Sequence, residues 1–299
     1  MTLHDMPAWR KAAATYNFAS DHYDSTPLAF WDRHGQRTVD LMGLKAGDCV
    51  LDVGCGTGAS ALPAAEAVGR DGYVVGIDVA ENMLTRARAK ARDRGLDNVE
   101  FDLADMADCG RADQTFDAVI SSFSVFFMPD LETQVAELWR LVRPGGRLGI
   151  TVWGPDAFEP GATIFSQEVR RIRPDMPDLK RPWERLTEPE ALRGLMRDSG
   201  TADPVVTTTE HTQALGEVED WWTIAMGSGF RAEIEQLHPR ERKIVKQHVL
   251  ARLTDQKVEA VAAHAVHAVA RKSRSRQIRK PIGCAVRPHS RTSSEAVTD

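Results

Sequence analysis

Apolar residues between positions 49 and 153 gather in short runs that alternate with longer helical segments. The apolar runs lie at 49–53, 73–78, 98–105, 116–123 and 147–153. Runs of this length that are rich in β-branched residues predict buried strands. The helical patterns between them lie at 60–68, 81–94 and 132–142. Strands and helices that alternate through short loops predict an α/β fold, with a parallel sheet covered by helices on both faces.

The pattern changes after Trp153. Residues 154–186 hold five prolines, which suits an inserted lid better than a sheet. We expect a helix at 187–199 with Thr187 as its N-cap, a strand at 204–213, and further helices within 217–253. Periodicity alone leaves 259–272 open between helix and strand.

The composition is that of an ordinary globular protein, with 42% hydrophobic and 27% charged residues among 299. No apolar run approaches the ~20 residues of a membrane-spanning helix, and the N-terminus lacks the apolar core of a secretory signal. The four cysteines show no metal-ligand spacing. We therefore expect a cytoplasmic protein with reduced thiols, no membrane span and no metal site.

Charge is distributed unevenly along the chain. The net charge is −5, but residues 271–299 hold eight Lys and Arg against two Asp and Glu, so the rest of the chain is acidic. An acidic body argues against a nucleic-acid partner, because binding to phosphates needs clustered cations. The segment 273–299 has few apolar residues, which predicts a solvated, disordered basic tail; a nucleic-acid arm is the alternative.

A glycine-rich loop follows the first predicted strand, in the stretch VLDVGCGTGA at 50–59. Glycine lacks a Cβ and adopts positive φ at little cost, so such a loop lets the backbone approach a ligand closely. Gly54, Gly56 and Ala59 fit the dinucleotide pattern G-x-G-x-x-G/A. Gly54, Gly56 and Gly58 fit another nucleoside-binding loop equally well, so the glycines alone leave both ligands open.

Acidic residues stand at the ends of three predicted strands: Asp52, Asp78 and Asp105. Ligands of open α/β sheets bind beyond the carboxyl ends of the strands, so these carboxylates and Ser122 are expected to converge. A carboxylate at the end of the second strand can accept both ribose hydroxyls, in nicotinamide sites as well. None of the three tyrosines is followed four residues later by the Lys that a common class of dehydrogenases uses, which excludes that class only.

Several of these stretches together resemble the successive motifs of class I S-adenosylmethionine-dependent methyltransferases. They are LDVGCGTG at 51–58, GID at 76–78, AD at 104–105, FDAVISSF at 116–123 and LVRPGGRLGI at 141–150. The match is dense over 48–153 and weak as far as about 272, where AVHAVARK is similar to the closing antiparallel strand of that fold. The spacing of the segment before the loop is similar to the branch that includes quinone-biosynthesis methyltransferases.

The resemblance implies a Rossmann-like, mostly parallel seven-stranded sheet with helices on both faces and a helical lid. It divides the chain into an N-terminal helical segment over the cofactor, a cofactor-binding core, a region of lid and substrate-pocket insertions, a closing strand and the basic tail. These parts are 1–36, 37–153, 154–258, 259–272 and 273–299.

The resemblance also implies that S-adenosyl-L-methionine is the cofactor, and it assigns contacts at the methionine end. Gly54, Gly56 and Gly58 shape the loop under the methionine part. Asp52 helps to hold the ammonium group of the cofactor, and Ser122 lines the same end.

At the adenosine end, the resemblance implies that Asp78 binds the ribose hydroxyls and that Met83 packs near the nucleoside. Asp105 accepts from the adenine amino group, and Met106 offers a backbone N–H to the ring. Each residue also has a purely structural interpretation. Asp78 could cap the following helix, Asp105 could serve a turn, and the methionines could be core residues.

Residues that could act on a methyl acceptor stand outside the cofactor loops. Tyr16, His22, Tyr23 and His211 are candidate bases, although lone Tyr and His residues are usually packed or solvated. An apolar acceptor pocket could use large side chains of which most are expected to serve core packing: Phe123, Phe126, Phe127, Met128, Trp153, Trp221 and Trp222.

These features predict methyl transfer from S-adenosylmethionine to a small, apolar or aromatic metabolite, at an oxygen, carbon or nitrogen atom. One alternative is an NAD(P)-dependent oxidoreductase on a Rossmann fold. The other is a non-catalytic protein that retains the cofactor site.

Overall fold

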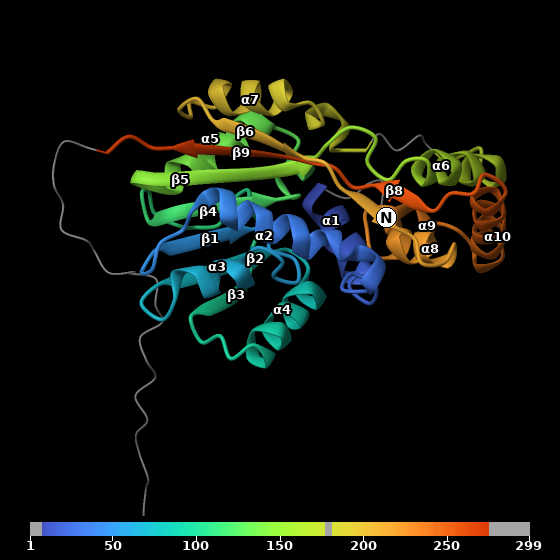
Figure 1. Ribbon diagram of the computed structural model, residues 1–299, viewed down its shortest axis with the longest axis horizontal. Coiled ribbons are helices and arrows are strands. Elements are labelled where there is room, and N and C mark those ends of the chain that lie inside the picture. The colour runs from blue at the N-terminus through green and yellow to red at the C-terminus, as the bar shows by residue number, and fades with distance from the viewer. Residues whose placement is uncertain (1–7, 177–180, 275–299) are drawn as a thin grey trace, which may run out of the picture.

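The computed structural model describes residues 8–176 and 181–274 (Figure 1). Its centre is a seven-stranded sheet with the strand order β3-β2-β1-β4-β5-β9-β6. The strands are β1 (Cys49–Val53), β2 (Tyr73–Asp78), β3 (Val99–Leu103), β4 (Phe116–Ser122), β5 (Val142–Trp153), β6 (Val205–Thr209) and β9 (Ala265–Arg271). β9 is antiparallel to both of its neighbours, whereas β1 to β5 pair in parallel. The predicted mostly parallel, seven-stranded sheet is confirmed.

Helices cover both faces of this sheet. One face carries α2 (Phe30–Met42), α3 (Ala61–Val68) and α4 (Glu81–Asp93), and the other carries α5 (Leu131–Leu141) and α7 (Pro189–Asp198). Along β1, Val50 packs with the first group and Leu51 with the second, as the two-residue repeat of a strand requires. Both side chains are fully buried, which explains why a strand covered on both faces has a continuous apolar sequence.

A second group of helices lies beyond one end of the sheet, at the right of Figure 1. It consists of α6 (Gly161–Ile172), α8 (Glu219–Met226), α9 (Arg231–Ile234) and α10 (Pro239–Asp255). α10 packs on α6 and α8, and α9 contacts the N-terminal helix α1 (Ala8–Ala19). The largely buried Arg231 pairs with Asp21 and Glu235, which ties this group of helices to the N-terminal segment.

Several element boundaries differ from the sequence-based expectations, and three of these differences have a clear structural origin. β5 begins at Val142 instead of 147, because its early residues also pair with β4 across an irregularity in register. The predicted strand 204–213 divides into β6 and β7 (Thr212–Ala214), and β7 pairs with β8 (Ala260–Ala262) in a separate two-stranded sheet. α7 begins at Pro189 with Glu188 as its N-cap, so the prediction of Thr187 is wrong. The fixed φ of proline suits the first helical position.

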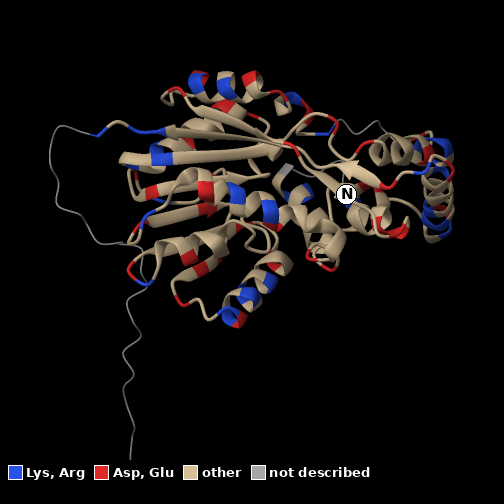
Figure 2. Cartoon of the chain, in the orientation of Figure 1, with Lys and Arg blue, Asp and Glu red and all other residues tan. Residues whose placement is uncertain are grey.

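Charged residues lie mainly on the outer helices, among them α4, α7 and α10, whereas the central strands carry few (Figure 2). None of the described helices combines the length and the apolarity needed to cross a bilayer. In the same residues, no group of three or more His, Cys, Asp or Glu side chains could hold a metal ion. Residues 275–299 of the predicted basic tail lie outside the described residues.

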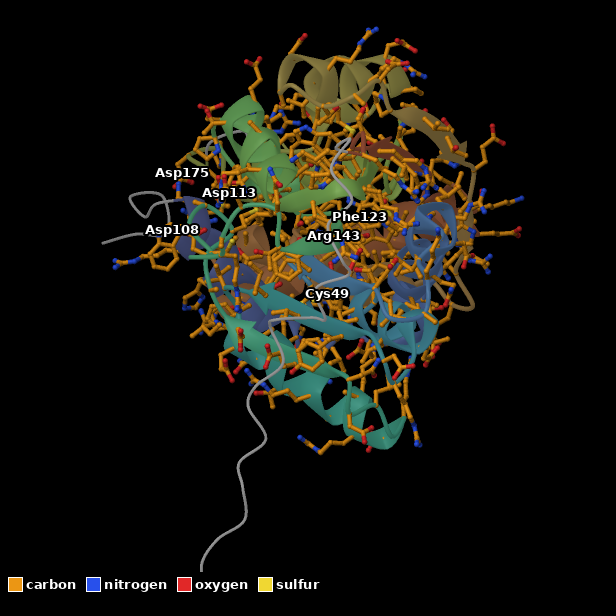
Figure 3. All side chains as sticks on the ribbon, turned by 90° about the vertical axis from the view of Figure 1, so that its left-hand side faces the viewer. Cys49, Asp108, Asp113, Phe123, Arg143 and Asp175 are labelled. Atoms are coloured by element: carbon orange, nitrogen blue, oxygen red, sulfur yellow. The ribbon has the colours of Figure 1, made fainter. Side chains whose placement is uncertain are left out.

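Cys55 and Cys109 are free thiols. Cys284 lies outside the described residues, so the expectation of reduced thiols stays a prediction for the rest. Cys49 is labelled in Figure 3, which views the molecule from the left-hand side of Figure 1.

A buried histidine pair lies between α2 and the sheet. His34 and His267 are almost fully buried, and their ring centroids are 5.9 Å apart. His34 Nε2 donates to the carbonyl of Ala263 at 2.7 Å, whereas His34 Nδ1 and His267 Nε2 have no partner among the residues described. Burial lowers the pKa of His34 to about 4 and that of His267 to about 3.

We expect the protein to lose stability as the pH falls from about 6.5 toward 4, because the unfolded chain then binds protons that folded His34 excludes. The lowered pKa of His34 corresponds to about 3 kcal/mol in the free energy of unfolding. His34→Gln keeps a donor for Ala263 but does not titrate, so its stability should depend less on pH. Urea denaturation between about pH 4 and 7 tests this. A variant as acid-sensitive as the wild type would contradict it.

Candidate active site

The glycine-rich loop turns at the carboxyl end of β1 and is fastened to the end of β2. The amides of Gly54 and Cys55 donate to the carbonyl of Ile77 at 2.8 and 3.0 Å. The amide of Gly56 donates to Oδ2 of Asp78 at 2.9 Å. Gly54 and Gly56 have φ values of 69° and 53°, which an L side chain adopts only with strain.

Close approach also explains why glycine stands at two of these positions. A Cβ on Gly54 would lie 2.3 Å from the Cβ of Ser124, and a Cβ on Gly58 would lie 2.9 Å from Cγ of Leu62. Leu62 belongs to α3, so Gly58 serves the packing of the loop on that helix. Gly54 and Gly56 instead border a cavity.

This cavity has about 680 Å³ of empty space, which includes the part open to solvent. Its lining includes seven of the predicted cofactor residues: Gly54, Gly56, Asp78, Met83, Asp105, Met106 and Ser122. It also includes two of the predicted catalytic candidates, Tyr16 and Tyr23. The structure thus brings together residues at the carboxyl ends of the four strands β1, β2, β3 and β4 with residues of the N-terminal segment.

Both carboxylate oxygens of Asp78 bind backbone amides. Oδ2 accepts from Gly56 and Oδ1 accepts from Ala80, each at 2.9 Å. Ala80 is the N-cap residue of α4, so Asp78 also supports the start of that helix. Burial raises the pKa of this carboxyl, and the amide hydrogen bonds oppose the shift. A carboxylate has about four acceptor sites, so Asp78 retains capacity for ligand hydroxyls.

Asp52 lies beneath the loop and does not border the cavity. It is fully buried, and its Oδ2 accepts from Ser60 Oγ at 2.7 Å. Its Oδ1 has no hydrogen-bond partner in the described part of the chain. Burial raises the pKa of Asp52 to about 7. This geometry gives no support to a direct contact between Asp52 and a cofactor ammonium group, which stays a prediction.

Asp105 and Met106 follow β3, at the cavity. Asp105 Oδ1 accepts from the amide of Ala107 at 3.0 Å, which is the turn role considered above. Gln134 of α5 donates to the carbonyl of Met106 at 2.9 Å and so holds the backbone there. The turn role of Asp105 leaves further acceptor sites on its carboxylate.

Neither of the two candidate histidines is among the described residues that line the cavity. His22 lies in the turns after α1, partly exposed, and its Nδ1 pairs with Asp21 at 2.6 Å. His211 lies between β6 and β7, with its ring centroid 5.8 Å from that of His34. This geometry gives no support to a catalytic role for either histidine, which stays a prediction.

Sequence reasoning missed five lining residues: Trp9, Ala12, Val79, Ala104 and Ser124. Trp31, in the N-terminal segment that was expected to fold over the cofactor, also lines the cavity. It named Phe123, Phe127 and Met128, which do border the cavity. Phe123 has a φ of 55°, uncommon for a bulky residue, and its amide donates to the carbonyl of Thr151 at 2.8 Å. It lies near the middle of the molecule in Figure 3, whereas Asp108 and Asp175 lie near its edge. No sequence signal marks this backbone reversal.

The predicted lid, residues 154–258, contributes none of the described lining residues. It supports one wall from behind, since Arg185 donates to the carbonyls of Phe126 at 3.1 Å and of Met128. The ring of Trp183 lies 6.0 Å from that of Phe126. This wall consists of the short helix η3 (Val125–Phe127) and Met128. The described part of 154–258 therefore contacts the cavity only indirectly, by supporting this wall.

Comparison with known proteins places this geometry in a family. A family model described as a methyltransferase domain matches residues 50–146. The chain is 36% identical over 149 residues to the aklanonic acid methyltransferase DauC of Streptomyces sp. strain C5, which covers 50% of this chain and 68% of that protein. The chain belongs to the S-adenosylmethionine-dependent methyltransferases. Membership of this family decides against the NAD(P)-dependent oxidoreductase.

Two further relatives of this methyltransferase are named for methylation at different atoms, oxygen and carbon. It is 45% identical over 129 residues to the nocamycin O-methyltransferase of Saccharothrix syringae, over 43% of this chain and 46% of that protein. It is 30% identical over 169 residues to the ubiquinone/menaquinone biosynthesis C-methyltransferase UbiE of Marinomonas sp. strain MWYL1, over 56% of this chain and 66% of that protein. The chain thus spans from about half to about two thirds of the length of these relatives.

Solved structures share the fold of this methyltransferase. YcgJ of Bacillus subtilis aligns with a TM-score of 0.54 at 16% identity, over 81% of this chain and 100% of that one. The cyclase SpnF aligns with a TM-score of 0.57 at 21% identity, over 90% of this chain and 98% of that one. At these identities the likeness concerns the fold alone.

Proposed function

We propose that this methyltransferase transfers a methyl group from S-adenosylmethionine to a small, apolar or aromatic metabolite. The observation that carries the proposal is a single cavity with two chemically different parts. Asp78 and Asp105 offer carboxylates beside the glycine-rich loop, and Trp9 and Phe127 contribute aromatic surface. The relatives named for nocamycin, for aklanonic acid and for quinone biosynthesis support oxygen or carbon as the acceptor atom, with nitrogen as the third option.

The described residues suit the proposed cofactor. Gly54 lets the loop backbone lie against Ser124, where a Cβ would collide, and Gly54 and Gly56 border the cavity, so ligand atoms can approach the loop backbone from the cavity. Asp78 retains acceptor sites for ribose hydroxyls, and Asp105 retains them for an amino group. Met83 is buried at the loop, where its flexible side chain can pack on a nucleoside.

The sulfonium of the bound cofactor supplies an electrophilic methyl group. The contribution of the chain is to hold an acceptor in line with that group and to exclude water, and such positioning can lower a barrier by about 7–11 kcal/mol. α1 contributes Trp9 and Tyr16 to one side of the cavity, and Phe127 and Met128 contribute to another. We propose that the helices within 154–258 act as the lid that keeps this wall in place, through Arg185.

A metabolite is also the acceptor class that the charge supports, since the acidic body of the chain opposes binding to nucleic acid. We retain the cytoplasm as the proposed location.

The function is tested by titrating the purified protein with S-adenosylmethionine and with NAD(H), and by measuring release of S-adenosylhomocysteine with phenols, quinols, carboxylic acids, amines and thiols. We expect binding of S-adenosylmethionine and release that depends on the acceptor. Tight binding of NAD(H) alone would overturn the proposal. Binding of S-adenosylmethionine with no release across the panel would favour a protein that uses this fold for another purpose, as the cyclase SpnF shares it.

Asp78→Ala is expected to weaken the binding of S-adenosylmethionine by about 1–3 kcal/mol, because the ribose hydroxyls would lose a buried acceptor. Asp108→Ala is the matched control, since Asp108 is an exposed acid after β3 that does not line the cavity. Isothermal titration of both variants measures the difference. An unchanged affinity for Asp78→Ala would remove this residue from the site.

A further inference from the structure

Two tyrosine hydroxyls at the cavity are available to a ligand. Tyr16 and Tyr23 both line the cavity, and within the described residues neither hydroxyl has a hydrogen-bond partner. Burial, with the charge of Asp78 nearby, raises the pKa of both side chains. Both therefore stay protonated and can donate a hydrogen bond. Both residues are partly exposed and line the cavity, so their hydroxyls can meet an acceptor on a bound ligand.

Tyr23 is fixed over the glycine-rich loop. Its ring stacks on Trp31 with centroids 5.0 Å apart and an interplanar angle of 5°. Its hydroxyl oxygen would lie 3.6 Å from a Cβ on Gly56. The loop residue Thr57 donates to Asp24, the neighbour of Tyr23, at 2.7 Å. This places Tyr23 at the methionine end of the proposed cofactor site.

Tyr16 belongs to a different part of the cavity. Its ring meets Phe127 edge-on, with centroids 5.6 Å apart, and lies 6.2 Å from the ring of Tyr23. Trp9 and Ala12 precede it by seven and four residues on α1, so all three lie on one helix face, and all three line the cavity. Tyr16 therefore provides a hydroxyl donor in an apolar wall, beside the space proposed for the acceptor.

We infer that Tyr16 is a specificity-determining residue that donates a hydrogen bond to an anionic oxygen of the acceptor, such as a carboxylate, enolate or acidic phenolate. The inference rests on the proposed function. The described lining holds no Lys, Arg or His, so the positive charge that an anion would meet is that of the cofactor sulfonium. Attraction between opposite charges is stronger in a cavity of low dielectric constant than in water. Such an acceptor arrives deprotonated, so Tyr16 does not have to remove a proton.

Naphthoate and its neutral analogue naphthamide test the inference as a matched pair of probes. With S-adenosylmethionine bound, we expect the wild type to bind naphthoate about tenfold more tightly than naphthamide. Tyr16→Phe should lower the affinity for naphthoate about tenfold and leave that for naphthamide within about twofold. Its affinity for S-adenosylmethionine should also stay within about twofold. Tyr23→Phe is the control, since it should weaken the cofactor and keep the preference for naphthoate.

The outcomes separate this inference from the proposed function. Equal binding of the two probes to the wild type would overturn the role of an anionic oxygen. An equal loss of both probes in Tyr16→Phe would mean that Tyr16 only shapes the wall. A protein that binds S-adenosylmethionine but not naphthoate would also reject the inference and leave the proposed function standing. A protein that does not bind S-adenosylmethionine would overturn the proposed function itself.

Discussion

Gly54→Ala is expected to weaken the binding of S-adenosylmethionine at least about 100-fold, which is about 3 kcal/mol. The new Cβ would lie 2.3 Å from the Cβ of Ser124, at a backbone φ of 69°. Ser124 cannot easily yield, because its Oγ donates to the carbonyl of Val53 at 2.6 Å and pairs with Ser121 Oγ at 2.7 Å. The loop would have to move, and the hydrogen bond from the amide of Gly56 to Asp78 at the end of β2 would be lost.

Gly69→Ala is the matched control for the backbone cost. Gly69 has a φ of 63°, but a Cβ there would meet nothing within 4 Å, and the residue does not line the cavity. This variant should lose about 1–3 kcal/mol of stability, because its φ of 63° and ψ of −173° are adopted readily only by glycine, and it should bind S-adenosylmethionine normally. The double variant Gly54→Ala/Ser124→Gly removes the colliding atom and should recover part of the affinity. Isothermal titration and thermal unfolding measure both quantities. Normal binding by Gly54→Ala would show that the loop does not approach the cofactor.

Asp52→Asn is expected to stabilise the protein at neutral pH by up to about 4 kcal/mol. The pKa of Asp52 is raised from 3.8 to about 7 in the folded state. The fold therefore favours the protonated form, and the contribution of Asp52 to the free energy of unfolding falls as the pH rises from about 4 to 7, opposite in sign to the contribution of His34. Asparagine keeps an acceptor for Ser60 and carries no charge.

Urea denaturation of Asp52→Asn between about pH 4 and 7 measures this effect. The gain over the wild type should shrink toward the acid end, where Asp52 is protonated in both states. A variant less stable than the wild type at neutral pH would show that the buried charge is compensated. The same variant tests the predicted ammonium contact: an affinity for S-adenosylmethionine lowered about tenfold or more would support it.

The sheet could be predicted from sequence because its strands are buried on both faces. The runs 49–53 and 73–78 coincide with β1 and β2. β1 ends at the glycine-rich loop, and β2 ends at Asp78. Parallel strands gather their carboxyl ends at one edge, so Gly54, Asp78 and Asp105 could be expected together from their positions alone.

Side-chain direction could not be predicted in the same way. Asp52 and Asp78 both stand at strand ends, but Asp52 turns under the loop toward Ser60 whereas Asp78 borders the cavity. Asp52 pairs with Gly76, so both acids lie on the same face of the sheet, and the difference is that Asp52 lies inside β1 whereas Asp78 is the last residue of β2. The apolar runs give no polar pattern that would reveal this difference. Trp9 was missed for a related reason, since the docking of α1 on the core is a tertiary contact.

The order of strands in the sheet also has a consequence for synthesis of the chain. β9 fills the position between β5 and β6 and pairs with both, although it follows them in the sequence. Until residues 265–271 have left the ribosome, β5 lacks a neighbour on that side and β6 lacks its pairing strand in this sheet. The nascent protein therefore carries open backbone edges while the intervening helices are made, and unpaired edges of this kind are sites for aggregation.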